Sequence, residues 1–574
     1  MTTRPSGPFL KATRMFRTMN LFLATALLLG VCSRAVAQET PLPFFSGDVD
    51  VLIRLQEPDQ TLEKVVKLVN QVQPGAGDAL RESQVSALGA LISNPTLTGV
   101  DQSRDWYAGV YFQTDAQPIV VFAIPAVKSE DLVSAVGEMT TRVHDKWVLY
   151  TDAEAIPAAD PAASAAVKMG EARIAGLTSG DLCIDVNVAH VREIYADQID
   201  VAQDKVLETL NQLRFLPAQG GMNPQVLVEI YGTMAEGAFQ ALADSQISRA
   251  SLSITDTELV LNKQVTFSEN SPSAQFLANH PQAEMSELMR LPAGGQFYYG
   301  VSGDMKALMQ AGMKMNMMLL QNGDPSKDLD ETIQLMQPIN FGPLMASLTV
   351  SKTDPSPFHA VSLFKANPID AVRKMNREIT KGVETIETET LKQTSTLKPD
   401  AETYGEFKAD VLEIKQEFKT DTPVGEMQLR FQKFMGGNDA LQSRMLYLKD
   451  EYVTSMGGGE KAVHELLKGL NSTKTNQLAK PRESLMKTAN LLAFLDLARF
   501  FGDTLSVAAT HIEDFPLPIN SQMIDTLNLK PSYLSMAAGS DANTARFEMR
   551  LPIEQILGIT KLSILIGTSV RGGL

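Results

Sequence analysis

The stretch Gly180-Asp181-Leu182-Cys183-Ile184-Asp185-Val186 contains the pattern on which the fold prediction rests. A Gly-Asp turn precedes an apolar segment, and we expect a strand over Leu182–Val188. The residues after it have apolar side chains at spacings of three and four, which is typical of an amphipathic helix. The same order of a strand-like segment and a helical pattern occurs at three other places: Val49–Leu55, Gln296–Val301 and Asn490–Leu495.

Each of these four strand–helix pairs is followed by a hairpin-like pair of alternating segments. The turns of the four hairpins contain an aspartate and fall at 114–116, 255–257, 353–355 and 540–542. A proline then follows, and we expect it to open another helix, because its missing N–H has no partner in the first helical turn. The four prolines are Pro125, Pro272, Pro368 and Pro552.

These repeated elements predict an α+β fold with antiparallel sheets. We expect four related strand–helix–hairpin–helix units, arranged as a duplicated pair. The predicted boundaries are 1–37 for a signal peptide, then 38–170, 171–285, 286–475 and 476–574, the third unit containing an inserted meander through 411–418 and 427–431. Residues 384–403, rich in Thr, Glu and Lys, are interpreted as a solvated helix end and loop.

The first residues have the composition of an export signal. Four basic residues and no acidic one precede the apolar run Leu21–Val31, which is too short to span a bilayer. Small side chains at Ala35 and Ala37 predict cleavage before Gln38, and hence an exported protein of the periplasm or the extracellular space. A retained membrane anchor and lipidation at Cys32 are the alternatives, and Val31 is a poor neighbour for lipidation.

Charge and cysteine content narrow the classes of function. The chain has 51 Lys and Arg against 67 Asp and Glu, a net charge of −16, which argues against binding to nucleic acid or to anionic lipid surfaces. After cleavage Cys183 is the only cysteine left, so an intramolecular disulfide is excluded. Its apolar neighbours predict a buried, inert thiol.

Catalytic and metal-binding signatures are weak, and we predict no catalytic residue, cofactor or metal ligand. No His has another His or Cys at metal-ligand spacing, and the cluster around His511 in 511–514 is interpreted as a loop. The Ser-x-x-Lys match from Ser484 to Lys487 lacks the other elements of penicillin-recognising enzymes. The glycines of 457–459 precede a helix without the Lys of a phosphate loop.

Methionines at spacing four form the least ordinary helical face, and they are Met305, Met309, Met313 and Met317. This stripe suits a core-facing helix. An adaptable apolar groove and a thioether site for Cu(I) are the two alternatives.

The segments Gly180–Val186, Leu291–Gly295, Ser251–Asp256 and Trp147–Asp152 together resemble those of large exported bacterial proteins of planctomycete type, which are built from repeated α+β units and have no known activity. The resemblance covers most of the mature chain and implies no functional residue.

Three interpretations of function follow. The first is a non-catalytic exported protein that binds or scaffolds an envelope protein. The second is a carrier of an apolar ligand held between a sheet and the long helices. The third is an unrecognised enzyme, for which polar groups such as Asp152, His190 or Asp450 would have to converge in one cleft.

Overall fold

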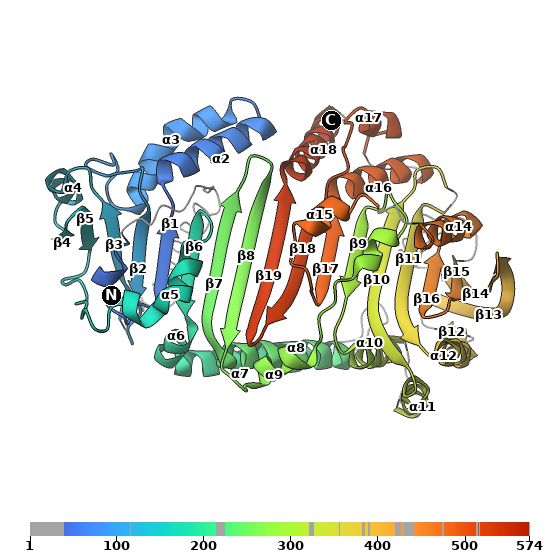
Figure 1. Cartoon of the computed structure of the whole chain (residues 1–574). Helices are drawn as coiled ribbons and strands as arrows, with labels where there is room; N and C mark the ends of the chain where they lie inside the picture. Colours follow the sequence, from blue (N-terminus) through green and yellow to red (C-terminus); the bar gives the residue numbers. More distant parts are fainter. Residues whose placement is uncertain are drawn as a thin grey trace, which may run out of the picture. The chain divides into compact units, whose positions relative to one another are not determined.

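The strands that begin the repeated sequence pattern pair with one another, antiparallel, in two places, and each pair has further strands on both sides (Figure 1). The computed structural model describes residues 40–572 except 115, 214–223, 321–325, 355, 382–384, 388–390, 419–425, 427–428, 430–440, 473–475, 513–514 and 516. The chain divides into two bodies, which we call the N-terminal body (40–199 and 245–267) and the C-terminal body (200–244 and 268–572). The predicted α+β class with antiparallel sheets is confirmed.

The sheet of the N-terminal body pairs in the order β4-β5-β3-β2-β1-β6-β7-β8, and each pair is antiparallel. The strands are β1 (Val51–Leu55), β2 (Trp106–Tyr111), β3 (Ile119–Pro125), β4 (Thr140–His144), β5 (Trp147–Thr151), β6 (Leu182–Asn187), β7 (Ser245–Ile254) and β8 (Glu258–Phe267). The helices are η1 (Leu42–Phe44), α2 (Pro58–Val72), α3 (Ala76–Leu91), α4 (Ser129–Val136), α5 (Ala165–Leu177) and α6 (Val188–Ile194).

Both faces of this sheet are covered, and strand β5 illustrates this, because its side chains are buried on both faces. Successive side chains of a strand point to opposite faces. Val148 and Tyr150 therefore join a core cluster with side chains of α2, α3 and α4. Trp147 and Leu149 join a second cluster with side chains of η1 and α5. All five residues of β5 are buried as a result.

The sheet of the C-terminal body pairs in the order β12-β13-β14-β15-β16-β11-β10-β9-β17-β18-β19, again antiparallel throughout. Its strands are β9 (Phe297–Val301), β10 (Asn340–Val350), β11 (Phe358–Asn367), β12 (Thr385–Glu387), β13 (Leu391–Tyr404), β14 (Phe407–Phe418), β15 (Leu441–Tyr447), β16 (Glu451–Met456), β17 (Leu491–Leu495), β18 (Leu534–Asp541) and β19 (Thr544–Pro552).

The helices of this body are α8 (Pro224–Asp244), α9 (Pro272–Asn279), η2 (Ser286–Arg290), α10 (Met305–Leu320), α11 (Ser326–Met336), α12 (Ile369–Lys381), α14 (Gly459–Leu470), α15 (Ala479–Glu483), α16 (Leu497–His511), α17 (Ser521–Asp525) and α18 (Ile553–Gly572). Helix α7 (Ala196–Leu213) begins in one body and ends in the other. Side chains of η2 and α14 pack on one face of the sheet, and those of α11, α12 and α16 pack on the other.

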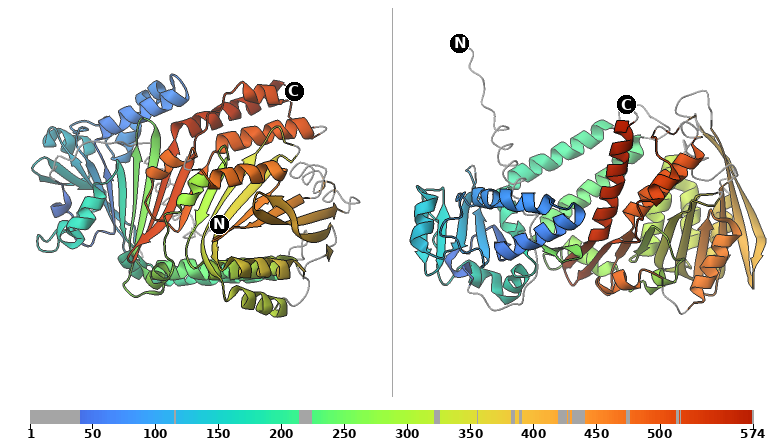
Figure 2. Two further views of the ribbon diagram at one scale, coloured as in Figure 1. Left: turned by 45° about the vertical axis from the view of Figure 1, so that its right-hand side comes forward. Right: turned by 90° about the horizontal axis from the view of Figure 1, so that it is seen from above.

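Eight strands of the C-terminal body, from β15 to β19 in its sheet order, follow the same connections as the eight strands of the N-terminal body. The difference is an insertion: α4 leads directly to β4, whereas β12, β13 and β14 lie between α12 and β15. Figure 2 shows β13 and β14 as a long extension at the end of this sheet.

One polar residue stands just before each of the four central strands, and we call these the frame residues: Asp50, Asp181, Gln296 and Asn490. Each backbone N–H donates to a carbonyl near the end of the neighbouring hairpin strand, at 2.7 to 3.0 Å. Each carbonyl accepts a hydrogen bond from a residue at the end of the paired central strand or directly after it, six positions beyond the frame residue of that strand. Those four donors are, in order, Asn187, Gln56, Asp496 and Ser302.

The expected central strands agree with the observed ones to within two residues. Two other expectations were wrong. Pro125 ends β3 and does not open a helix, and α4 begins at Ser129. Residues 391–404 form β13 instead of a loop, because β14 pairs along its length. Segment 427–431 of the expected meander lies almost wholly outside the described residues.

Candidate functional site

One cluster of polar side chains in the N-terminal body is formed by Asp50 and His190. Nδ1 of His190 lies 2.5 Å from Oδ1 of the buried Asp50 carboxylate, whose Oδ2 accepts the Phe112 N–H at 2.7 Å. The ring of His190 is 39 % exposed. The other two residues considered for catalysis, Asp152 and Asp450, are exposed and lie in turns after β5 and β15. The pair anchors the start of β1 to helix α6.

A second polar cluster in this body is a buried ion triplet. The Asp185 carboxylate is fully buried and accepts from Arg173 Nε at 2.7 Å and from Arg249 Nη2 at 2.8 Å. The pair Arg54 and Asp105 is also buried, with 2.7 Å between Nε and Oδ2. Each of these carboxylates is engaged by arginine side chains of the same body, so the ion pairs connect neighbouring elements and leave no carboxylate free for a ligand.

Two buried titratable groups lie at the start of β6. Burial raises the pKa of the Asp181 carboxyl to about 7, although its Oδ2 accepts the Ile254 N–H. Its Oδ1 has no described hydrogen-bond partner. Burial also raises the pKa of the Cys183 thiol to about 12, so the thiolate is scarce at neutral pH.

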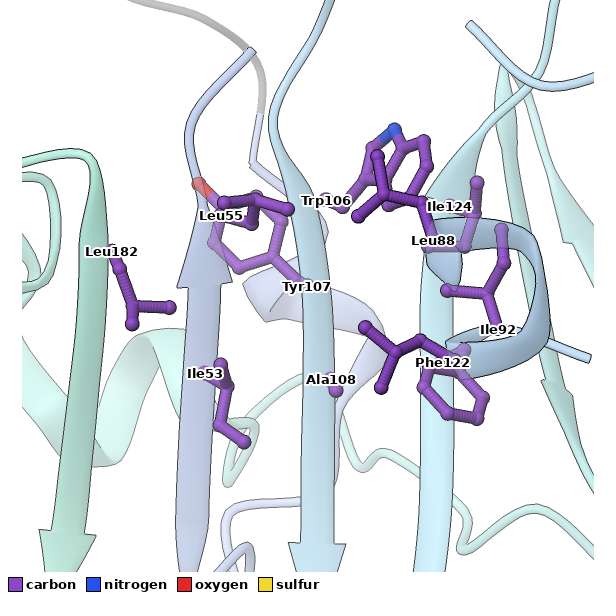
Figure 3. Close-up of a pocket in the computed structure, with 11 residues that line it drawn as sticks. Ile53, Leu55, Leu88, Ile92, Trp106, Tyr107, Ala108, Phe122, Ile124 and Leu182 are labelled. Atoms are coloured by element: carbon purple, nitrogen blue, oxygen red, sulfur yellow. The ribbon is translucent and has the colours of Figure 1, made fainter. Parts of the chain in front are cut away.

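The N-terminal body contains an apolar cavity of about 50 Å³ between α3 and the sheet (Figure 3). Leu88 of α3 and Ile92, which follows this helix, face Trp106 and Ile124 of the sheet. The lining continues over β1, β2, β3 and β6 with Ile53, Ala108, Phe122 and Leu182, respectively. Ile53 and Phe122 are partly exposed. The cavity is therefore the covered end of a wider apolar sheet face.

The C-terminal body has an apolar sheet face at the same strands. Tyr299 of β9 and Leu491 of β17 are 43 % and 38 % exposed. Counted from the frame residues, they occupy the places of Ile53 and Leu182, three residues and one residue into the central strands. Their neighbours across the sheet are also apolar: Leu344, Val301 and Ala538 in one row, and Ala346, Ala493, Met536 and Met549 in the next.

A larger and more polar groove lies between α12 and β13, with a volume of about 740 Å³. The helix contributes Arg373, Lys374 and Arg377 together with two acidic residues, and the strand contributes hydroxyl groups. The groove was not predicted, because residues 384–403 were interpreted as a solvated helix end and loop. Leu391 and Leu397 are the only apolar residues of 391–398, so the sequence lacks the alternation that marks a strand.

Another cavity, of about 470 Å³, lies between α9 and the turn that joins β18 to β19. His280 lines it, with its ring stacked on Phe276 at 3.9 Å between centroids. Gln282 donates to the Ser540 carbonyl across it. The side chains of His280 and Gln282 are therefore already engaged by neighbouring residues.

The methionine stripe lies on α10. Met305 is 4 % exposed, and Met309 and Met313 pack against the core cluster that includes Met375 of α12. The side chain of Met317 lies outside the described residues. The groove proposed for these four methionines therefore stays a prediction, and core packing accounts for three of them.

The residues of the short sequence motifs either have separate partners or have a role in the backbone conformation and its hydrogen bonds. Ser484 Oγ donates to the Pro481 carbonyl, whereas Lys487 pairs with Glu284 and is 84 % exposed. Gly458, the residue directly before α14, has a φ of +63°, a backbone conformation that favours glycine. The backbone therefore accounts for glycine at this position, and no bound phosphate is needed to explain it. His511 hydrogen-bonds the Val507 carbonyl, and 513–514 lie outside the described residues.

The predicted cleavage residues Ala35, Ala37 and Gln38 also lie outside the described residues. Across the part of the chain that is described, no helix combines the length and the apolar character needed to cross a bilayer. Within the same part, His, Cys, Asp and Glu side chains nowhere gather in threes as a metal site requires.

Comparison with family models, with curated proteins and with solved structures finds no match to this chain.

Proposed function

We propose that this chain is an exported, non-catalytic protein that binds an apolar ligand along the sheet faces of its two bodies. Export rests on the basic and apolar leader that ends at Ala37. Binding without catalysis rests on the polar clusters, in which Asp50, Asp185 and Asp105 are each engaged by a His or Arg side chain of the same body.

The observation that carries the proposal is the partly exposed apolar sheet face. Leaving apolar surface in water forfeits about 25 cal/mol per Å². Contiguous exposed apolar patches on soluble proteins usually mark sites of interaction. Tyr299 and Leu491 in one body, and Ile53 in the other, place such surface on the central strands, and Leu182, at the position that corresponds to Leu491, is buried.

The size of the cavity decides how a ligand would lie. A pocket that encloses a small molecule usually has a volume of roughly 300 to 1,000 Å³. The covered space beside Trp106 has about 50 Å³, enough for the end of an apolar chain but not for a whole ligand. We therefore infer that an elongated ligand, such as a long acyl chain, lies on the sheet with one end beneath α3.

A scaffolding role is the second candidate, in which an apolar segment of an envelope protein covers the same face. The absence of a deep enclosed pocket in the described cavities beside the sheet favours this alternative. Binding assays with a free ligand separate the two, because a scaffold has no reason to bind a lone acyl chain.

We further propose that the chain contains four related units in two tandem pairs. The support is the hydrogen-bond pattern of the frame residues, which recurs at Asp50, Asp181, Gln296 and Asn490 with the same spacing to their partners. Duplication would explain why each body presents the same sheet face, and hence two ligand sites in one chain.

The test uses the full mature chain and a fatty acid brominated near its methyl end. Bromine quenches a nearby indole, and Trp106 lines the cavity whereas Trp147 belongs to the cluster on the other sheet face. We expect saturable partial quenching, reduced when Leu88 is replaced by Gln. No quenching together with unchanged thermal stability would refute an acyl ligand.

The C-terminal body is tested with a fluorescent apolar probe, N-phenyl-1-naphthylamine. The variant Leu491→Gln should lower the number of bound probes. The control Ile564→Gln alters an apolar side chain that is 60 % exposed but lies on α18. Equal binding by both variants would contradict a site on the sheet.

A further inference from the structure

We propose that the groove between α12 and β13 binds a polyhydroxylated organic anion, such as a uronic acid or a sugar phosphate. The groove is distinct from the apolar sheet face, and its lining is polar. Its volume of about 740 Å³ falls in the range of small-molecule sites.

The position of the groove in the fold is the first reason. The strand β13 that forms one wall belongs to the insertion β12–β14, which has no counterpart between α4 and β4 of the N-terminal body. Functional sites are commonly built by additions to a scaffold that is otherwise kept for stability. The insertion therefore marks the place where the C-terminal body gained a property of its own.

The cations of α12 are the second reason. Arg377 is already paired, because its guanidinium donates to both carboxylate oxygens of Asp410 and also lies 3.2 Å from the carboxylate of Asp400. Lys374 is exposed and pairs with no described carboxylate, so its charge is available in the groove. In a chain with a net charge of −16, an uncommitted cation inside a cavity favours an anionic ligand.

Arg373 supplies a second, oriented cation. Its guanidinium carbon lies 4.8 Å from the centroid of the Tyr447 ring, and this stacking fixes the plane of the group. Its Nε has no hydrogen-bond partner among the described residues. A guanidinium held in one orientation loses little freedom when it receives a carboxylate or a phosphate.

The hydroxyl groups of β13 suggest the rest of the ligand. Thr394, Ser395 and Thr396 line the groove, and their hydroxyl groups make no hydrogen bond to the described part of the chain, whereas their backbones pair with β14. Because successive side chains of a strand alternate, Ser395 lies on the strand face of Leu397, which packs with α12, and the two threonines lie on the other face. Hydroxyl groups both donate and accept, so they match the hydroxyl groups of a sugar. The acidic residues Asp370 and Glu378 also line the groove, and they would accept from sugar hydroxyls and disfavour a polyanion.

The experiment is isothermal titration calorimetry of the full mature chain with three probes at millimolar concentration: glucuronate, glucose 6-phosphate and neutral glucose. We expect one of the two anions to bind and glucose to bind far more weakly. Which anion binds distinguishes a carboxylate site from a phosphate site. Equal binding of glucose, or no binding of either anion, overturns the proposal.

Variants locate the site. Lys374→Gln should weaken anion binding about tenfold, the typical contribution of one charged hydrogen bond. Lys468→Gln removes the same charge from the exposed side of α14 and should leave binding unchanged. Ser395→Ala should weaken binding of the sugar anion severalfold, because it removes the hydroxyl group on the strand face that carries Leu397. Equal affinities of Lys374→Gln and Lys468→Gln would place the anion elsewhere and refute this site.

Discussion

Asp50 and Asp181 form the same set of hydrogen bonds at the starts of β1 and β6. Each N–H donates to a carbonyl of the adjacent strand at 2.9 Å, and each carboxylate accepts the N–H two residues further on, from Phe112 and Ile254 respectively. The surroundings of the second carboxylate oxygen differ between the two residues. That of Asp50 faces His190, whereas that of Asp181 is buried without a described partner.

The buried Asp181 carboxyl should make the N-terminal body less stable as pH rises. Its folded pKa of about 7 lies above the ordinary value of 3.8, because burial disfavours the charged form. The stability is complete below pH 4, where both states are protonated, and is lost as pH rises through 7. The loss is roughly 2–4 kcal/mol. Asp181→Asn keeps an acceptor for the Ile254 N–H and should remove this dependence.

Urea unfolding followed by tryptophan fluorescence at pH 5 and pH 8 measures the effect. Both tryptophans of the chain, Trp106 and Trp147, lie in the N-terminal body, so the signal reports that body. Asp152→Asn, an exposed site in the same body, is the control. A stability gain by Asp181→Asn that is the same at both pH values would show that the carboxyl does not titrate in this range.

Removal of the Asp185 carboxylate should be strongly destabilising. Arg173 and Arg249 would be left 18 % and 14 % exposed with no counter-ion, and breaking a buried pair in this way costs about 3–5 kcal/mol. The matched control is Asp48→Ala, because Asp48 pairs with Lys168 at the surface and is 70 % exposed. That change should cost less than about 1 kcal/mol. The same fluorescence assay compares them, and equal costs would contradict the buried triplet.

Leu88→Ala should enlarge the apolar cavity under α3. Leu88 is 2 % exposed, and truncation of such a leucine costs about 2–5 kcal/mol. The control Val85→Ala on the same helix, at a side chain 47 % exposed, should change stability by less than about 0.5 kcal/mol. If the cavity extends the ligand site, Leu88→Ala should also bind N-phenyl-1-naphthylamine more tightly, which a titration at matched folded fraction would detect.

The methionine stripe can be tested by separating stability from binding. Met309→Gln should destabilise the C-terminal body, because Met309 packs against the cluster around Met375 and Met445. Leu308→Gln on the same helix, 44 % exposed, should have little effect. Hydrogen exchange of the β15 backbone is the measurement. Unchanged exchange in Met309→Gln, with loss of probe binding, would instead support the apolar groove.

The export signal predicts a defined mature end. Protein purified from the envelope of its own host should have Gln38 as its first residue in N-terminal sequencing. Ala37→Lys should prevent processing and give a chain heavier by the length of the leader. A mature protein that begins at Cys32 and contains lipid would establish the alternative processing.

Local patterns were sufficient for the central strands and insufficient for the insertion. The strand at Leu182–Asn187 was predictable because it is an apolar run between a Gly-Asp turn and a helix. The prediction that Pro125 opens a helix was wrong because proline fits both the end of a strand and the start of a helix. Strand β13 was missed because its polar residues are held by pairing with β14, a partner that the local composition does not reveal.

The sequence by itself determined the α+β class, the antiparallel character and the central strands, since these depend on periodicities of two and of 3.6 residues within short windows. Only the tertiary structure decided which side chains meet. Asp50 reaches His190 across 140 positions, and Arg373 reaches Tyr447 across the inserted strands. Such pairs form because strands distant in the chain lie side by side in a sheet, and no local spacing encodes which strand lies next to which.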